Sequence, residues 1–233
     1  MKRKHIFNED YFEVIDTEEK AYWLGFIAAD GYIHKNHNEV NITLSIRDEN
    51  HLKKFLKCLN HSSVNVLTYR KQAYSSEYKE TEKVTLRLSS KKMNTDLRKF
   101  GLDNNKSSTL KPIIISDELK HHMIRGFFDG NGGVCYNKVT DKRGKTIKIK
   151  YIPRIIFSGT HDFLKFINES LPVQCKTILW DKRTKDSYVL DYRSITRYKQ
   201  IQDYLFKDAS IWLDRKKEKF DLINKSIGLG LDI

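Results

Sequence analysis

Hydrophobic and polar residues alternate along several short stretches of the chain. The two longest runs, Val40–Arg47 and Lys148–Ser158, have the period of a half-buried β-strand. Shorter runs of the same kind are 64–69, 84–88, 177–180 and 188–192. Apolar residues at helical spacing predict helices over 49–59, 93–100, 162–171 and 196–206. The pattern therefore predicts helices and short strands that follow one another along the chain.

These elements occur twice in the same order. Each copy begins with a glycine-containing helical segment, WLGFIAADGYI at 23–33 and IRGFFDGNGGV at 124–134, and continues in the order α-β-β-α-β-β-α. A repeat of about 100 residues is too long for a solenoid unit. The repeat therefore predicts an α+β protein of two similar subdomains, residues 1–111 and 112–233.

The two repeated helices carry small residues four positions apart. These are Gly25 and Ala29 in the first copy and Gly126 and Gly130 in the second. Residues at this spacing share one helix face, and small side chains there let two helix backbones approach closely. Because glycine costs about 1 kcal/mol inside a helix, its recurrence in both copies favours direct packing of the two helices. An ordinary buried helix is the alternative.

Each of these helices ends on a polar residue, Asp30 in the first copy and Asn131 in the second. If the helices pack together, the two side chains lie next to each other. A carboxylate is electrostatically unfavourable at a helix C-terminus, and a bound divalent cation would remove the conflict. Oxygen ligands of this kind suit Mg²⁺. A lone aspartate before a glycine is otherwise an ordinary turn residue.

The charge of the chain points to a polyanionic partner. Its 43 lysines and arginines against 30 acidic residues give a formal net charge of +13 and a pI of about 9.5, and nucleic acid is the usual partner of such a protein. A surface rich in lysine is the alternative.

The three cysteines lack zinc-site spacing, and no apolar run is long enough for a membrane span. We expect an intracellular, cytoplasmic protein.

The motifs at 23–31 (WLGFIAADG) and 124–132 (IRGFFDGNG) resemble the two LAGLIDADG motifs of monomeric homing endonucleases. The resemblance extends over nearly the whole chain, since the elements after each motif also match. It implies two antiparallel sheets that form a saddle over double-stranded DNA, and a bacterial, phage or organellar origin. It also implies Mg²⁺, or another divalent cation such as Mn²⁺, bound at the eighth motif position of each copy.

That position is Asp30 in the first copy and Asn131 in the second, where the family usually has an acid. An amide oxygen can ligate a metal, but it brings no charge and cannot take a proton. The resemblance also implies a lysine near each site, for which Lys106 and Lys216 are the candidates, with Arg215 and Lys217 as competitors for the second. A solvated surface charge is the alternative for each.

Alternation along the strands predicts a polar sheet face that meets DNA, with loops that contact phosphate. The residues predicted to bind DNA are Asn41, Thr43, Ser45, Arg47, Arg70, Lys71, Arg87, Lys148, Lys150, Arg154, Lys182, Arg183 and Arg193. A solvated sheet face is the alternative, and a register slip of one residue would exchange the two faces.

Three functions stay open at this point. The first is a Mg²⁺-dependent endonuclease that makes a staggered double-strand cut at a long asymmetric DNA site. The second is a nickase in which Asp30 is the one remaining acid. The third is a catalytically silent DNA- or RNA-binding relative, such as a maturase or a regulator, for which Asn131 is the main support.

Overall fold

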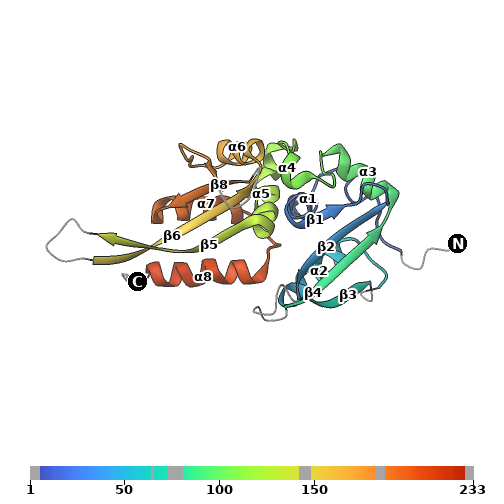
Figure 1. Ribbon diagram of the computed structural model, residues 1–233, viewed down its shortest axis with the longest axis horizontal. Coiled ribbons are helices and arrows are strands. Elements are labelled where there is room, and N and C mark those ends of the chain that lie inside the picture. Colours follow the sequence, from blue (N-terminus) through green and yellow to red (C-terminus); the bar gives the residue numbers. More distant parts are fainter. Residues whose placement is uncertain (1–5, 64–65, 73–80, 142–147, 182–186, 229–233) are drawn as a thin grey trace.

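Two four-stranded antiparallel sheets lie side by side, and two packed helices lie between them (Figure 1). The computed structural model describes residues 6–63, 66–72, 81–141, 148–181 and 187–228. The predicted α+β fold of two similar units is confirmed. Each sheet is formed by consecutive strands of one half of the chain, in the orders β1-β2-β4-β3 and β5-β6-β8-β7.

The N-terminal half has the predicted order of elements with one additional short helix. Its elements are α1 (Glu18–Asp30), β1 (Gly31–Ile33), β2 (Glu39–Ser45), the 3₁₀ turn η1 (Ile46–Asp48), α2 (Glu49–Cys58), β3 (Leu67–Gln72), β4 (Thr81–Ser89), α3 (Lys91–Lys99) and the short α4 (Lys106–Thr109).

The C-terminal half repeats this order and ends in a long helix that the hydrophobic pattern did not predict. Its elements are α5 (Asp117–Asn131), β5 (Gly132–Asp141), β6 (Lys148–Gly159), α6 (His161–Ser170), β7 (Leu179–Trp180), β8 (Tyr188–Arg193), α7 (Ile195–Phe206) and α8 (Asp214–Gly228).

Helix α1 is buried on all sides over residues 21–28, which explains why its sequence shows no polar stripe. Local signals determine where it begins. Thr17 accepts a hydrogen bond from the Lys20 amide, and Glu18 and Glu19 place negative charge at the N-terminal end of the helix dipole. Thr160 and Ser194 cap α6 and α7 in the same way.

The core lies between the helices and one face of each sheet. In the first sheet Val40, Ile42 and Leu44 of β2 are buried, and in the second Ile155 and Phe157 of β6 are buried. The residues between them are on the opposite face. This alternation follows from the strand period of two and leaves one face of each sheet uncovered by helices.

One predicted strand boundary is wrong. Strand β2 ends at Ser45, and Arg47 belongs to the 3₁₀ turn η1, because the chain turns there to begin α2. Arg47 is exposed, but it does not continue the polar face of β2.

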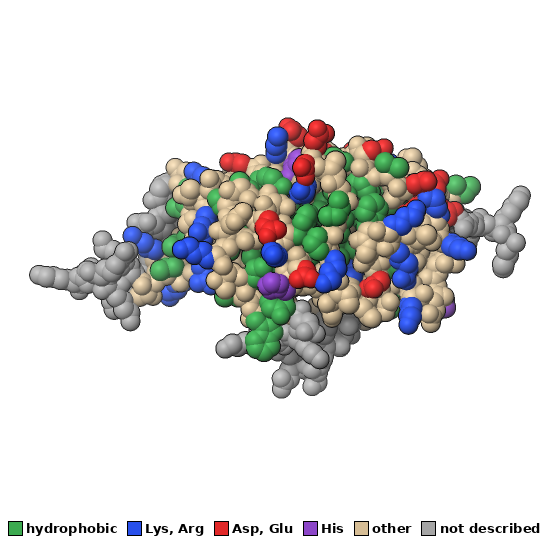
Figure 2. Space-filling view, turned by 90° about the horizontal axis from the view of Figure 1, so that it is seen from above, with side chains coloured by type: hydrophobic (Ala, Val, Ile, Leu, Met, Phe, Trp, Pro, Cys, Tyr) green, Lys and Arg blue, Asp and Glu red, His purple; other side chains and the backbone are tan. Residues whose placement is uncertain are grey.

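Basic and acidic side chains are interspersed over the molecular face seen in Figure 2, so the excess of positive charge does not gather there. Within the described ranges, no helix combines the length and the apolar character needed to cross a bilayer.

Candidate active site

Helices α1 and α5 contact each other through their backbones at two glycines. A Cβ atom added to Gly25 would lie 1.9 Å from the carbonyl oxygen of Met123, and one added to Gly126 would lie 1.9 Å from that of Tyr22. The two contacts are reciprocal, as expected for two copies of one unit around a pseudo-two-fold axis. No side chain larger than hydrogen fits at either position without moving a helix.

The C-terminal ends of the same helices also lie together. A Cβ atom on Gly130 would lie 2.2 Å from the Cβ of Ala29 and 3.4 Å from the Cγ of Asp30. Asp30 and Asn131 are the last residues of α1 and α5. The structure therefore brings Asp30 next to the end of α5, where Asn131 is located.

Each helix end is held by a buried lysine from its own half. Lys106 Nζ donates hydrogen bonds to the carbonyl oxygens of Ala28 (2.9 Å) and Ala29 (2.8 Å). Lys216 Nζ donates to those of Phe128 (2.6 Å) and Gly132 (2.7 Å). Cations at these positions are favourable because carbonyl groups without a helical partner concentrate negative charge there.

Burial makes these two amines unusually easy to deprotonate. It lowers the pKa of Lys106 to about 8 and the pKa of Lys216 to about 8, although nearby carboxylates favour their charged forms. Asp30 is exposed to solvent on one side. Crowding by protein on its other sides raises its pKa, while Lys216 and Lys106 act in the opposite direction. The three groups therefore form one electrostatic unit.

The competitors of Lys216 have other partners. Arg215 Nε lies 3.0 and 2.9 Å from the two carboxylate oxygens of Asp48, which belongs to η1 in the other half. Lys217 pairs with Asp221 on the surface of α8. Of the three residues, Lys216 alone has a hydrogen bond to the end of α5 among the contacts described.

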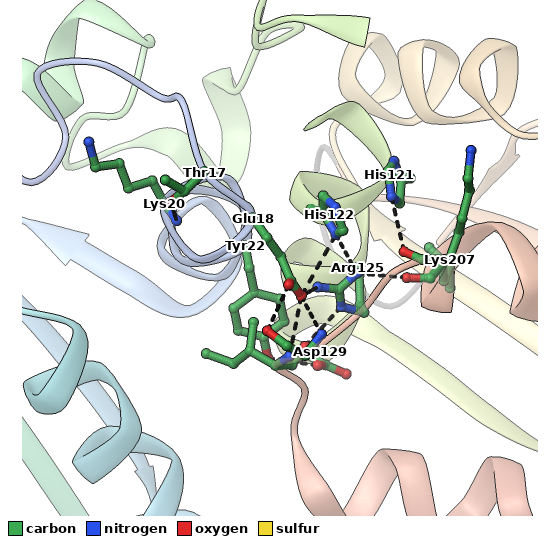
Figure 3. A network of polar contacts seen from close by, with 12 residues as sticks. Thr17, Glu18, Lys20, Tyr22, His121, His122, Arg125, Asp129 and Lys207 are labelled. Carbon is green, nitrogen blue, oxygen red and sulfur yellow. Dashed lines mark hydrogen bonds and ion pairs between the residues drawn. The ribbon is translucent and has the colours of Figure 1, made fainter. Parts of the chain in front are cut away.

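A buried polar network joins α1 to α5 near the site (Figure 3). Tyr22 donates a 2.7 Å hydrogen bond to Asp129, which also accepts one from the amide of Leu213 (2.8 Å). One turn away, Arg125 pairs with Glu18 at 2.6 Å. Asp129 is 1% exposed and is held inside the interface, so it does not replace the acid that position 131 lacks.

The polar face of the first sheet is formed by residues of all four strands. The register pairs Asn41 with Arg87 and Thr43 with Thr85, and Arg70 with Lys83. Lys71 was also predicted to bind DNA. It pairs with Glu82 and lies on the other face of the sheet, away from the remaining predicted residues. Tyr32, Lys83 and Thr85 share the polar face but were not predicted from the sequence, because their orientation follows from strand register.

The polar face of the second sheet includes Arg154, with Ile156 and Ser158 beside it on β6 and Lys150 exposed near the start of that strand. Arg193 lies opposite Arg154 on β8. Both arginines contact Asp191, which the sequence analysis did not predict as a site residue. The side chain of Lys148, together with Lys182 and Arg183, lies outside the described residues.

Oxygen donors at the two helix ends would suit a magnesium ion better than a soft metal. Asp30 offers a carboxylate and Asn131 an amide oxygen, which are hard ligands. Among the described residues no group of three or more His, Cys, Asp or Glu could hold a metal. The oxygen donors of Asp30 and Asn131 fit a hard divalent cation such as Mg²⁺, for which these two residues would be protein ligands.

This combination of two paired helices and two sheets defines the fold of the two-domain LAGLIDADG proteins. Residues 17–101, which include the first motif, match the sequence family of the LAGLIDADG-like domain, and the predicted resemblance to this family is confirmed. No functionally curated protein matches the sequence.

Solved structures of this fold cover nearly the whole chain at low sequence identity. The LAGLIDADG meganuclease I-AabMI bound to uncleaved DNA has a TM-score of 0.58 and 10% identity, over 90% of each chain. The I-SmaMI LAGLIDADG homing endonuclease bound to cleaved DNA has a TM-score of 0.59 and 12% identity, over 92% of this chain and 90% of that one. The I-LtrWI LAGLIDADG homing endonuclease bound to target DNA has a TM-score of 0.58 and 11% identity, over 95% and 92%.

Proposed function

We propose that this protein is a monomeric, sequence-specific endonuclease that cuts double-stranded DNA with the help of Mg²⁺. The observation that carries the proposal is the close approach of the two helix ends that carry Asp30 and Asn131, each end held by a buried lysine. The three similar structures described above are DNA complexes of meganucleases or homing endonucleases.

The uncovered sheet faces support DNA as the partner. They carry arginine, asparagine, serine and threonine side chains, which are suited to hydrogen bonding with base edges in the major groove. The net charge of +13 favours association with a phosphate backbone. Because the two faces differ in sequence, the preferred site is asymmetric.

Asp30 and Asn131 would be the protein ligands of the cation. A bound Mg²⁺ would polarise the scissile phosphate and make an attacking water more acidic. Lys106 and Lys216, whose pKa values of about 8 leave them mostly charged at pH 7, would stabilise negative charge that develops on the phosphate. Asn131 can orient a ligand but cannot accept a proton.

The two helix ends are therefore chemically unequal, and we expect unequal cleavage of the two DNA strands. The test is a cleavage selection on a randomised duplex library with Mg²⁺, in which the two strands are resolved separately. Slow cleavage of one strand is the expected result, with nicked duplex as an intermediate. Binding without cleavage of either strand would favour the alternative of a DNA-binding relative that has lost its activity.

Replacement of Asn131 by aspartate restores the missing charge and proton acceptor. The Asn131→Asp variant is expected to speed cleavage of the slower strand by roughly tenfold or more, the scale on which changes around a metal site act. The rate at the faster strand should change little. Equal rates on both strands in the wild-type protein would show that asparagine suffices there.

Replacement of Asp30 by asparagine removes the one carboxylate at the site. The Asp30→Asn variant is expected to lose cleavage of both strands while its affinity for the selected duplex stays within a few fold, because Asp30 lies at the helix end and not on a sheet face. Cleavage is followed on gels and affinity by fluorescence anisotropy. Loss of affinity together with cleavage would contradict the assigned role.

A further inference from the structure

One carboxylate lies on the polar face of the C-terminal sheet, where the proposed function places DNA. On β8 the side chains of Leu190 and Tyr192 are buried under the helices, so Asp191 between them points to the uncovered face. Its side chain is only 6% exposed. A negative charge on this face repels a polyanion, so its presence there indicates another role for the carboxylate.

Asp191 holds two arginines from neighbouring strands. Arg154 donates to it from Nε and Nη2, each at 2.8 Å, in a bidentate contact. Arg193 donates from the same two nitrogens, Nε at 3.0 Å and Nη2 at 2.5 Å. These contacts lower the pKa of Asp191 despite its burial, so the carboxylate is ionised at neutral pH.

The carboxylate makes this arrangement of two arginines possible. Arg154 and Arg193 are direct cross-strand partners in the register, and like charges in such positions repel each other. Asp191 lies diagonally between them, opposite Ile156. It offsets the repulsion and fixes the direction of both side chains.

The contacts with Asp191 use the Nε and Nη2 edge of each guanidinium. Arg154 also has a side-chain contact with Cys135, its partner on β5. Each guanidinium has a second edge besides the one that contacts Asp191. That second edge, formed by Nη1 and Nη2, carries parallel N–H donors in a fixed plane. Such a pair of donors matches O6 and N7 of guanine in the major groove. A guanidinium that a carboxylate already holds in place loses less side-chain entropy on binding than a free one.

The two arginines line a hollow that continues toward the active site. Its lining includes Asn131, Ile156 and Ser158, together with Trp180 of the edge strand. Ile156 and Trp180 place apolar surface beside the arginines, and a hydrogen bond formed in apolar surroundings is stronger than one in water. The hollow is therefore suited to base edges rather than to a phosphate alone.

We propose that Asp191 is a positioning residue that fixes Arg154 and Arg193 as readers of two guanines in the half-site bound by the C-terminal sheet. This inference rests on the proposed function, because it requires sequence-specific DNA binding, but it does not require cleavage. It assigns a specificity role to an acidic residue that weakens the attraction for the DNA backbone.

The removal of this carboxylate has two opposite effects on binding. The Asp191→Asn variant frees both arginines, so the preference for guanine falls at two positions of the same half-site. It also removes a negative charge from the DNA-facing surface, so affinity for unrelated duplexes rises and their salt dependence becomes steeper. A carboxylate that served stability alone would not combine these changes.

The experiment begins with selection of bound sequences from a randomised duplex pool by the full-length protein without divalent cations. Affinity is then measured for every single-base change in the selected site. Two guanines are expected in one half-site, each preferred by roughly 10- to 100-fold. Arg154→Gln should abolish the preference at one of them and Arg193→Gln at the other, whereas Asp191→Asn weakens both.

Three further variants separate the inference from simpler explanations. Arg154→Lys keeps the charge but loses the planar fork, so the guanine preference should fall while the salt dependence stays the same. Asp162→Asn removes the same charge from α6, where Asp162 pairs with Lys111, and should leave specificity unchanged. Arg87→Gln changes the other sheet and should affect only the other half-site.

The outcomes distinguish the two claims. If the wild-type protein selects no DNA sequence, the proposed function is wrong and the inference falls with it. If it selects a sequence whose base preferences are unaffected by changes at Arg154, Arg193 and Asp191, the proposed function stands and the inference is overturned. Thermal unfolding of each variant shows whether it is folded before binding is measured.

Discussion

His51 is a histidine that the protein keeps neutral. It is 2% exposed, and its Nε2 lies 3.0 Å from the hydroxyl of Tyr22, which itself donates to Asp129. His51 therefore donates through Nε2 in this chain of hydrogen bonds. Burial lowers its pKa to about 3, and the charge of Lys54 acts in the same direction.

This lowered pKa makes stability depend on pH. The unfolded chain binds a proton at His51 below its ordinary pKa of 6.5, whereas the folded protein does not bind one until about pH 3. Stability is therefore fully present above pH 6.5 and is lost as the pH falls. Between pH 6.5 and pH 5 the loss due to His51 should be roughly 2 kcal/mol.

The comparison is with His51→Gln, whose amide can still donate to Tyr22 but does not titrate. Urea unfolding at several pH values should show the wild-type protein losing more free energy of unfolding than the variant as the pH falls. Parallel pH dependence of the two proteins would contradict a pKa far below 6.5.

The sequence predicted some residues of the candidate site and missed others for a physical reason. Asp30, Asn131, Lys106 and Lys216 were found because they belong to short motifs or their flanks, where position along the chain determines position in space. Asp191 was missed because its importance comes from Arg154 on another strand. Arg47 was misplaced because alternation of residue types does not show where a strand ends.

At the scale of elements, the contact between α1 and α5 depends on glycine. A Cβ on Gly25 would meet the Met123 carbonyl oxygen at 1.9 Å, and this oxygen belongs to a buried helix that cannot yield locally. The Gly25→Ala variant should therefore lose roughly 3 kcal/mol of stability, the upper end of overpacking costs.

A glycine of the same chain provides the control for this prediction. A Cβ on Gly133 would meet no atom within 4 Å, so Gly133→Ala should be neutral or stabilise by less than about 1 kcal/mol. Chemical denaturation gives both values. Equal stability of the two variants would mean that the helices can separate at little cost.

The repeated elements could be predicted because each carries its own hydrophobic period. The long strands β2 and β6 and the helices after them are examples. Helix α8 was not predicted, since within it only Lys216, Phe220 and Ile223 are buried. Strand β7 is two residues long, Leu179–Trp180, and exposed, which is too short for any period to appear.

At the scale of the molecule, polar contacts join the two halves outside the helix pair. Glu18 of the first half accepts hydrogen bonds from Ser210 and from the amide of Ile211 in the second, and Lys54 pairs with Asp214. Arg125 is fully buried among these contacts and donates to the carbonyls of Leu205 and Ile211 and to Glu18.

Arg125 should therefore determine how firmly the halves hold together. Arg125→Met fills similar space but leaves the carbonyls of Leu205 and Ile211 without this donor and Glu18 without its arginine partner, so the free energy of unfolding should fall by about 3 kcal/mol. Fluorescence and circular dichroism measured in urea test this. Arg197→Met, which changes an exposed arginine of α7, should have little effect, and a similar loss in both variants would contradict the argument.

The lysines at the helix ends have a geometric consequence for the reaction. An ammonium group has three N–H bonds, and Lys106 and Lys216 each use two of them on backbone carbonyls. Each ammonium group is therefore fixed through two of its N–H bonds at a helix end. The direction of its third N–H bond is set by those carbonyl groups rather than by a side-chain rotamer. Because the close contacts at Gly25 and Gly126 fix α1 relative to α5, the two ammonium groups are a fixed distance apart. If the protein cuts both DNA strands as we propose, this fixed distance would set the stagger between the two cuts, which would be the same for every sequence that the protein accepts.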